Sequence, residues 1–191
     1  MYVFVDGSFA NNKDLSSQIG YVILLGNETQ LGEGKVKLRG NLITWSSTKS
    51  KRITRSVLAS EIYGMVAGVD AGYSIATSIT QILKQLGIDR PLPIVVCTDS
   101  FSLYECIVKL GTTKEKRLMI DIMALRQMYE RRELVEVRWI AGATNPADAM
   151  TKAAPNSSLQ KLINTNEIEI MVEGWVERKA VTAVIEPHLE S

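Results

Sequence analysis

Residues 94–100 read IVVCTDS, and this stretch decides the fold class. Its first five positions are almost all apolar, as expected for a strand that is buried on both faces of a sheet. The run ends at Asp99, and open α/β sheets bind their ligands at the carboxyl ends of their strands. The stretch therefore predicts an α/β protein with a functional site at this edge of its sheet.

Three other acids lie at similar boundaries along the chain. Asp6 ends the apolar run of residues 2–5, Glu61 lies in the first turns of a predicted helix, and Asp148 follows an Asn-Pro pair that is typical of a helix start. Carboxylates that gather at one edge repel one another unless a cation lies among them, and Mg²⁺ prefers such oxygen ligands. The simplest interpretation is a two-metal site for phosphodiester chemistry.

Each acid also has an ordinary explanation when it is taken alone. Asp-Gly is a common turn pair, which would account for Asp6. Aspartate is a favoured helix cap, which would account for Asp99. Glu61 and Asp148 suit the positive end of a helix. Together these explanations require four coincidences, whereas one shared site explains all four acids, so we prefer the shared site.

The hydrophobic pattern predicts antiparallel strands first, followed by alternating strands and helices. Early strands are expected at residues 2–6, 19–25 and 42–46, with a turn at Gly26-Asn27 and an ambiguous segment at 29–38. A helix is expected from Ser56 to Leu86, in which three glycines spaced by four predict close packing on a neighbour. Later elements are a strand at 94–98, helices at 100–110 and 116–132, a strand at 134–140 and a helix from 145. This order predicts an α/β layer fold with a mixed β-sheet flanked by helices.

Composition excludes several classes of protein. With 191 residues, of which 46% are hydrophobic, the chain is expected to form one domain with an ample core. No apolar run approaches the roughly 20 residues of a membrane helix, so no membrane partner is expected. Cys97 and Cys106 make neither a disulfide framework nor a zinc site. The single histidine, His188, lies near the C-terminus, which argues strongly against histidine-based catalysis.

The net charge of +1 does not indicate a basic nucleic-acid binder, but the charge is uneven. One basic cluster is formed by Lys49, Lys51, Arg52 and Arg55, and residues 114–117 hold another. Local clusters can contact phosphates even when the total charge is near zero. Solvated loop charge is an equally good explanation for either cluster.

Four motifs in a fixed order resemble the ribonuclease H fold. They are DGS at residues 6–8, SEIY at 60–63, TDS at 98–100 and NPADAMTK at 145–152. More narrowly, ITWSS at 43–47, the Arg55-Ser56 pair and ADAMTK at 147–152 resemble the ribonuclease H domain of copia-type LTR-retrotransposon polyproteins. The resemblance covers residues 2–154, which we take as the ribonuclease H-like domain. Residues 155–191 form a C-terminal extension that resembles, as far as residue 178, that of fungal members.

The resemblance implies a Mg²⁺-dependent endoribonuclease that cuts the RNA strand of RNA–DNA hybrids during reverse transcription. Two Mg²⁺ ions are implied, with Mn²⁺ as a substitute. Asp6 would bridge the ions, Glu61 and Asp99 would hold the ion near the leaving 3′ oxygen, and Asp148 would hold the ion that activates water. Substrate contacts, which include readout of the 2′-hydroxyl, would fall to a further set of residues. These are Gly7, Ser8, Arg55 and Ser100.

The family context implies an upstream reverse transcriptase domain in the same polyprotein. Because the first strand begins at residue 2, we expect the chain to be the C-terminal piece of such a polyprotein. Location in the cytoplasm is expected, in virus-like particles, with the nucleus as an alternative. A competing hypothesis is a non-catalytic or host-adopted nucleic-acid-binding module. The loss of one or more of the four carboxylates would indicate this alternative. One departure is the loop at residues 141–144, which lacks the histidine of many cellular ribonucleases H; we expect this to lower turnover.

Overall fold

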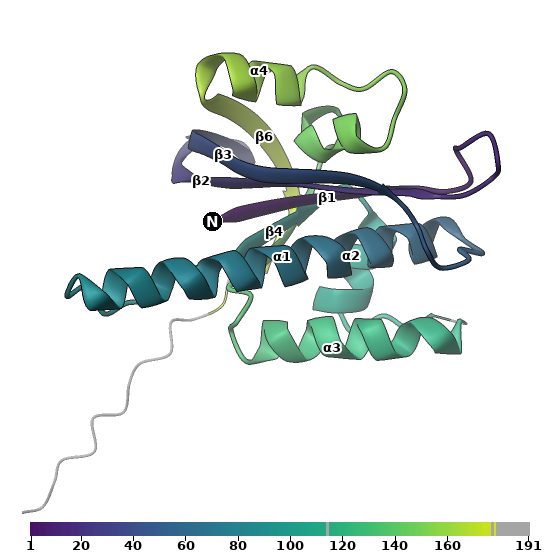
Figure 1. Ribbon diagram of the computed structural model, residues 1–191, viewed down its shortest axis with the longest axis horizontal. Helices are drawn as coiled ribbons and strands as arrows, with labels where there is room; N and C mark the ends of the chain where they lie inside the picture. Colours follow the sequence, from purple (N-terminus) through teal and green to yellow (C-terminus); the bar gives the residue numbers. More distant parts are fainter. Residues whose placement is uncertain (114, 177, 179–191) are drawn as a thin grey trace, which may run out of the picture.

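The computed structural model describes residues 1–113, 115–176 and 178, and it forms a three-layer arrangement around one sheet (Figure 1). The strands are β1 (Tyr2–Ser8), β2 (Gln18–Gly32), β3 (Lys35–Lys49), β4 (Val95–Thr98), β5 (Glu136–Ile140) and β6 (Glu167–Gly174). The helices are α1 (Val57–Gln85), α2 (Phe101–Val108), α3 (Met119–Glu130) and α4 (Ser158–Thr165). Short 3-10 helices are η1 (Lys116–Leu118), η2 (Gly142–Thr144) and η3 (Pro146–Met150).

The sheet is mixed, as the sequence predicts. Its strand order is β1-β2-β3-β6-β5-β4, and the sheet closes on itself as a barrel. The strands β1, β2 and β3 pair in antiparallel fashion, whereas β4 runs parallel to both β1 and β5. The carboxyl ends of β1 and β4 therefore lie side by side, which is the arrangement that brings Asp6 close to Asp99.

The strands β2 and β3 form one long hairpin, so the expected turn at Gly26-Asn27 and the separate short strand at 42–46 are wrong. Gly26 pairs with Gly40 in the middle of the hairpin. A Cβ atom on Gly26 would lie only 2.4 Å from the carbonyl oxygen of Arg39, so these glycines permit close approach of two backbones. The actual turn lies at residues 32–34, all three of which have positive φ.

Helix α1 begins and packs as the sequence predicts. The side chain of Ser56 accepts a hydrogen bond from the backbone N–H of Ala59 and caps the helix. The glycines at positions 64, 68 and 72 face β1, and a Cβ on Gly64 would lie 2.8 Å from the carbonyl oxygen of Asp6. The glycine row thus lets α1 lie directly on the strand that carries Asp6.

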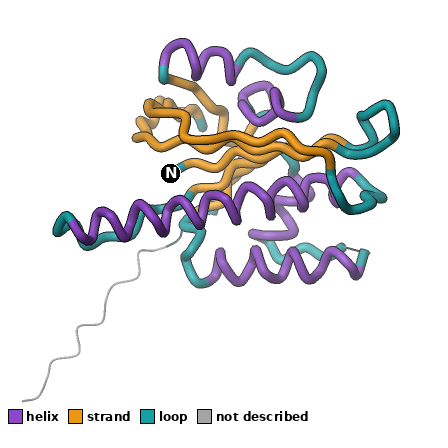
Figure 2. The backbone as a smooth tube through the Cα atoms, in the orientation of Figure 1, coloured by secondary structure: helices purple, strands orange, loops and turns teal. Residues whose placement is uncertain are grey.

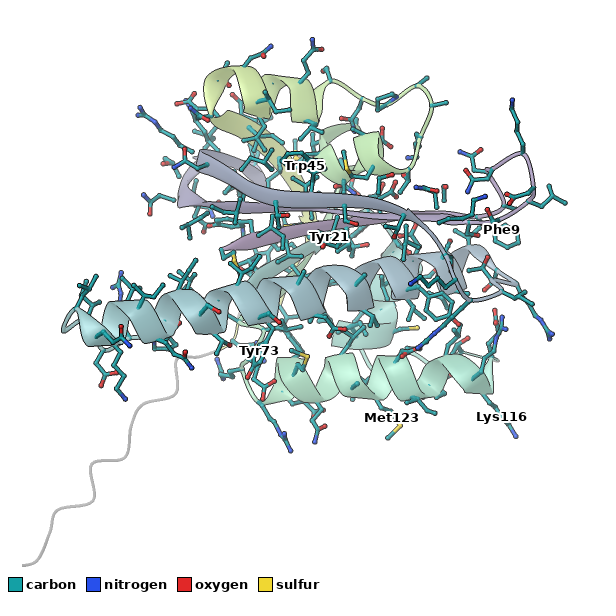
Figure 3. The ribbon with its side chains drawn as sticks, viewed as in Figure 1. Phe9, Tyr21, Trp45, Tyr73, Lys116 and Met123 are labelled. Atoms are coloured by element: carbon teal, nitrogen blue, oxygen red, sulfur yellow. The ribbon has the colours of Figure 1, made fainter. Side chains whose placement is uncertain are left out.

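The sheet separates two hydrophobic cores. One core lies between the sheet and α1, α2 and α3. The other lies on the opposite face of the sheet, where side chains of the strands, including β6, pack with α4 and η3. Side chains of the hairpin alternate between the two sides: Tyr21 faces the helices, while Trp45, which pairs with Val22, faces the opposite side (Figure 3).

The segment after residue 154 takes part in the sheet. This segment holds the helix α4 and the strand β6. Strand β6 pairs with the first half of β3 and with the end of β5. The boundary between a domain at 2–154 and an extension at 155–191 stays a prediction. Lys114 and His188 lie outside the described residues.

Two loops meet at the end of the molecule where α1 begins (Figure 2). The loop between β1 and β2 and the loop between β3 and α1 are joined by a hydrogen bond from the N–H of Ser50 to the carbonyl of Ser17, at 2.8 Å. In the part of the chain that the structure describes, no helix has the length and apolar character needed to cross a membrane.

Candidate active site

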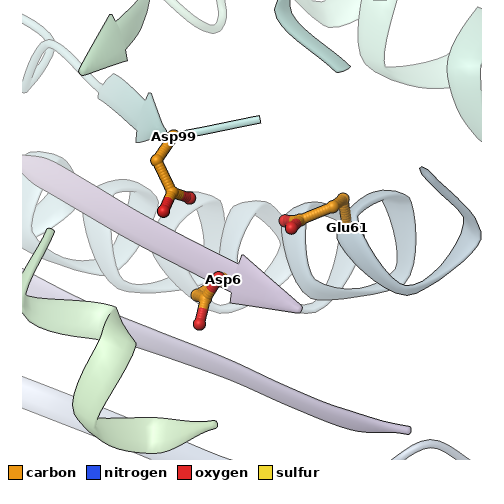
Figure 4. A group of neighbouring side chains, drawn as sticks. All are labelled: Asp6, Glu61 and Asp99. Carbon is orange, nitrogen blue, oxygen red and sulfur yellow. The ribbon is translucent and has the colours of Figure 1, made fainter. Parts of the chain in front are cut away.

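Three of the four predicted acids converge in space. Asp6 lies on β1, Asp99 directly follows β4, and Glu61 lies in the second turn of α1. One carboxylate oxygen from each of them lies within 4.8 Å of the other two (Figure 4). The parallel pairing of β1 with β4 and the close seat of α1 on β1 create this convergence.

Burial makes this cluster electrostatically unfavourable without a cation. Asp6 is 2% exposed and Glu61 is 7% exposed. Burial raises the pKa of Glu61 well above its usual value, and the charges of Asp6 and Asp99 raise it further. Burial also raises the pKa values of Asp6 and Asp99. Buried carboxylates of like charge are expected to be paired with a cation or to titrate at higher pH.

The donor set fits a hard divalent cation. The Oε2 atom of Glu61 is buried and has no hydrogen-bond partner. A buried charged oxygen without a partner is costly, and a coordinated ion is one means of satisfying it. Carboxylate oxygens are the ligands that Mg²⁺ and Mn²⁺ prefer. Asp6, Glu61 and Asp99 are therefore suited to hold such an ion together.

Asp148 is not a member of this group of three. It lies in η3 and is 4% exposed, and its Oδ2 atom accepts a hydrogen bond of 2.7 Å from the backbone N–H of Asn156. Its Oδ1 atom forms an ion pair with Lys152. The charge of Asp148 still acts on both Asp6 and Asp99, so it lies at the border of the cluster. Its role as a metal ligand stays a prediction.

Comparison with solved structures identifies the fold. No family model matches the sequence, and no curated protein matches it. LC11-RNase H1, isolated from compost by a metagenomic approach, superposes with a TM-score of 0.55 at 17% identity, over 83% of this chain and 96% of that chain. RNase H1 from the halophilic archaeon Halobacterium salinarum superposes with a TM-score of 0.53 at 17% identity, over 84% of this chain and 97% of that chain. The chain has the ribonuclease H fold.

Within this ribonuclease H fold, three non-acidic residues that sequence reasoning did not assign contact the acids. The hydroxyl of Thr151 donates to Oδ2 of Asp6. The side-chain amide of Asn145 donates to the carbonyl of Val5 at 3.0 Å and to Oδ1 of Asp99 at 3.3 Å. Lys152 pairs with the fourth acid, as described above. All three belong to the motif at residues 145–152, and this motif is the sequence feature that could have identified them.

The four predicted substrate-binding residues lie in different settings. A Cβ on Gly7 would lie 2.5 Å from the carbonyl carbon and oxygen of Ser60, so this glycine lets α1 approach β1. Ser8 has a buried hydroxyl oxygen without a partner, and Arg55 is exposed in the loop before α1. The hydroxyl of Ser100 caps α2, so the explanation of Asp99 as that cap is wrong. Contact of these residues with nucleic acid stays a prediction.

Proposed function

We propose that the chain is a metal-dependent ribonuclease H that cuts the RNA strand of an RNA–DNA hybrid. The observation that carries the proposal is the convergence of Asp6, Glu61 and Asp99 within 4.8 Å at the strand ends of a ribonuclease H fold. A further structural neighbour, LC11-RNase H1 in complex with an RNA/DNA hybrid, has a TM-score of 0.52 at 16% identity, over 83% of this chain and 98% of that chain. That neighbour supports a hybrid as the substrate class.

Each acid would have a definite task in this reaction. Two Mg²⁺ ions, or Mn²⁺ in their place, would supply an activated water and charge stabilisation for the leaving 3′ oxygen. Asp6 would be shared between the ions, because it belongs to the group with Glu61 and Asp99 and its pKa is also raised by the charge of Asp148. Glu61 and Asp99 would hold one ion, and Asp148 would hold the other once Lys152 has moved away from it.

The surrounding residues would hold the acids in place and contact the hybrid. Thr151 and Asn145 fix the orientation of Asp6 and Asp99 through the hydrogen bonds described above. Selection of RNA over DNA requires a contact with the 2′-hydroxyl. The backbone groups of Gly7 and Ser8, which follow Asp6, and Ser100, which follows Asp99, are the candidates. Arg55, which is exposed beside the start of α1, is suited to contact a phosphate.

We further propose that this ribonuclease H belongs to a copia-type retrotransposon polyprotein and acts with an upstream reverse transcriptase domain. The support for this context is the set of sequence motifs at residues 43–47, 55–56 and 147–152. The corresponding location would be the cytoplasm, within virus-like particles, or the nucleus.

The test is a cleavage assay with an end-labelled RNA–DNA hybrid and a DNA duplex in the presence of Mg²⁺. The protein should cut only the RNA strand of the hybrid. Asp99→Asn should lower cleavage by orders of magnitude with little change in melting temperature, since an amide of equal size removes charge and not volume. The matched control is Asp89→Asn, an exposed acid outside the site, which should cleave as the wild type does. Full cleavage by Asp99→Asn would refute the proposal.

A further inference from the structure

A lysine side chain occupies one border of the carboxylate cluster. Lys152 follows η3, and its Nζ atom forms an ion pair with Oδ1 of Asp148. The two partners differ in burial, because the side chain of Lys152 is 45% exposed whereas that of Asp148 is 6% exposed. The second oxygen of Asp148 is held by the backbone of Asn156, so the acid is fixed while the lysine stem can move.

The charge of Lys152 reaches the other three acids as well. It opposes the effect of burial on the pKa values of Asp6, Glu61 and Asp99. In return, Asp148, Asp6 and Asp99 raise the pKa of Lys152 against the lowering effect of its own partial burial. Within residues 1–113, 115–176 and 178, no other lysine or arginine forms an ion pair with any of the four acids.

We infer that Lys152 is an internal counter-ion of the site, which competes with a divalent cation for Asp148. The inference rests on the proposed function, in that the same acids would bind the metal. A metal ion that takes Asp148 as a ligand competes with the ammonium group for Oδ1, because Oδ2 already accepts the N–H of Asn156. The flexible, partly exposed stem of Lys152 permits that displacement.

This arrangement has two consequences for the site. Without metal, the ammonium group offsets part of the repulsion among the carboxylates and stabilises the folded chain. With metal, the same group lowers the affinity for the ion on the Asp148 side relative to the affinity for the ion held by Asp6, Glu61 and Asp99. An ordinary exposed ion pair would do neither, since such pairs contribute little to stability and do not act on other charged side chains.

The experiment measures Mn²⁺ binding and melting temperature for the wild type and for variants of Lys152. Free Mn²⁺ is counted by electron paramagnetic resonance during titration, so the readout is independent of cleavage. Lys152→Met should raise the affinity for the weaker ion by about tenfold or more, the size by which one charge within 4–6 Å changes such an equilibrium. It should also lower the melting temperature without metal and enlarge the rise that Mn²⁺ produces.

Two control variants separate a charge effect from a change in packing. Lys152→Arg keeps the charge and should bind Mn²⁺ nearly as the wild type does. Lys161→Met removes a lysine of similar exposure that pairs with Glu169 away from the site, and it should leave Mn²⁺ binding unchanged.

The outcomes distinguish this inference from the proposed function. If the wild type cleaves the hybrid but Lys152→Met binds Mn²⁺ no more tightly than the wild type, the counter-ion inference is wrong and the proposed function stands. If Lys152→Met tightens Mn²⁺ binding but no protein cleaves the hybrid, the inference stands and the proposed function is wrong. If the wild type binds no Mn²⁺, both are wrong.

Discussion

Replacement of Gly7 by alanine tests whether the seat of α1 on β1 sets the geometry of the acids. The new Cβ would lie 2.5 Å from the carbonyl carbon and oxygen of Ser60 and 2.7 Å from the amide nitrogen of Glu61. These are backbone atoms of α1, so no side-chain rotation relieves the contact. Ordinary contact begins at 3.4 Å, so α1 has to shift by about 1 Å, which carries Glu61 away from Asp6.

The expected effects of Gly7→Ala follow from that shift. Overpacking of this kind costs about 1–3 kcal/mol of the free energy of unfolding. A misplacement of about 1 Å at a catalytic group lowers the rate by roughly 100-fold. The assays are urea denaturation and hybrid cleavage by protein shown to be folded under the assay conditions.

The matched control is Gly26→Ala, at a position that is equally tight but remote from the acids. Its Cβ would lie 2.4 Å from the carbonyl oxygen of Arg39, so a similar loss of stability is expected. Its folded fraction should cleave at the rate of the wild type. The reasoning is refuted if Gly7→Ala retains full activity, or if both variants lose activity to the same degree.

Two further predictions concern stability. Arg138 is 6% exposed and pairs with Glu28 and Glu136, which are 31% and 20% exposed. Arg138→Met should therefore lower the free energy of unfolding by about 1–3 kcal/mol, as measured in urea, because it removes charge-assisted hydrogen bonds and leaves two partly buried carboxylates without a partner. A loss as small as that of breaking an exposed pair, a few tenths of a kcal/mol, would contradict this. Because the pKa of Glu61 is raised in the folded chain, its ionisation costs stability, and this cost grows as pH rises above the ordinary value of 4.5. Without metal, Glu61→Gln should therefore melt at a higher temperature than the wild type, and this difference should grow from pH 4.5 towards neutrality. A difference that does not change with pH would contradict the raised pKa of Glu61.

The sequence predicts the acids of the site better than it predicts their partners. Asp6 and Asp99 could be placed because each ends an apolar run, and strands of that kind meet at one edge of a sheet. Thr151 and Lys152 could not be assigned, because a hydroxyl and an ammonium group become informative only when their neighbours in space are known. Asp148 shows the same limit, since its pairing with Lys152 depends on side-chain direction and not on position in the chain.

The hairpin shows why a local signal can mislead. Gly26 followed by Asn27 has the composition of a turn, but glycine also serves where two backbones approach closely. The pairing partner, Gly40, lies fourteen positions away in sequence, and only the register of the two strands reveals it. Likewise, the sequence of β6 does not reveal that this strand pairs with both β3 and β5.

The position of β6 in the sheet has a consequence for the order of events during synthesis. The segment that carries Asp148 lies between β5 and β6 in the chain, and β6 bonds to β3, which emerges more than a hundred residues earlier. A nascent chain that has released only β1 to β5 has an incomplete sheet and an uncovered second core. Since domains emerge from the ribosome from the N-terminus onward, the proposed active site should remain unassembled until residues 167–174 have left the exit tunnel. The proposed activity would then appear only after β6 has been made, although Asp6, Glu61 and Asp99 emerge much earlier.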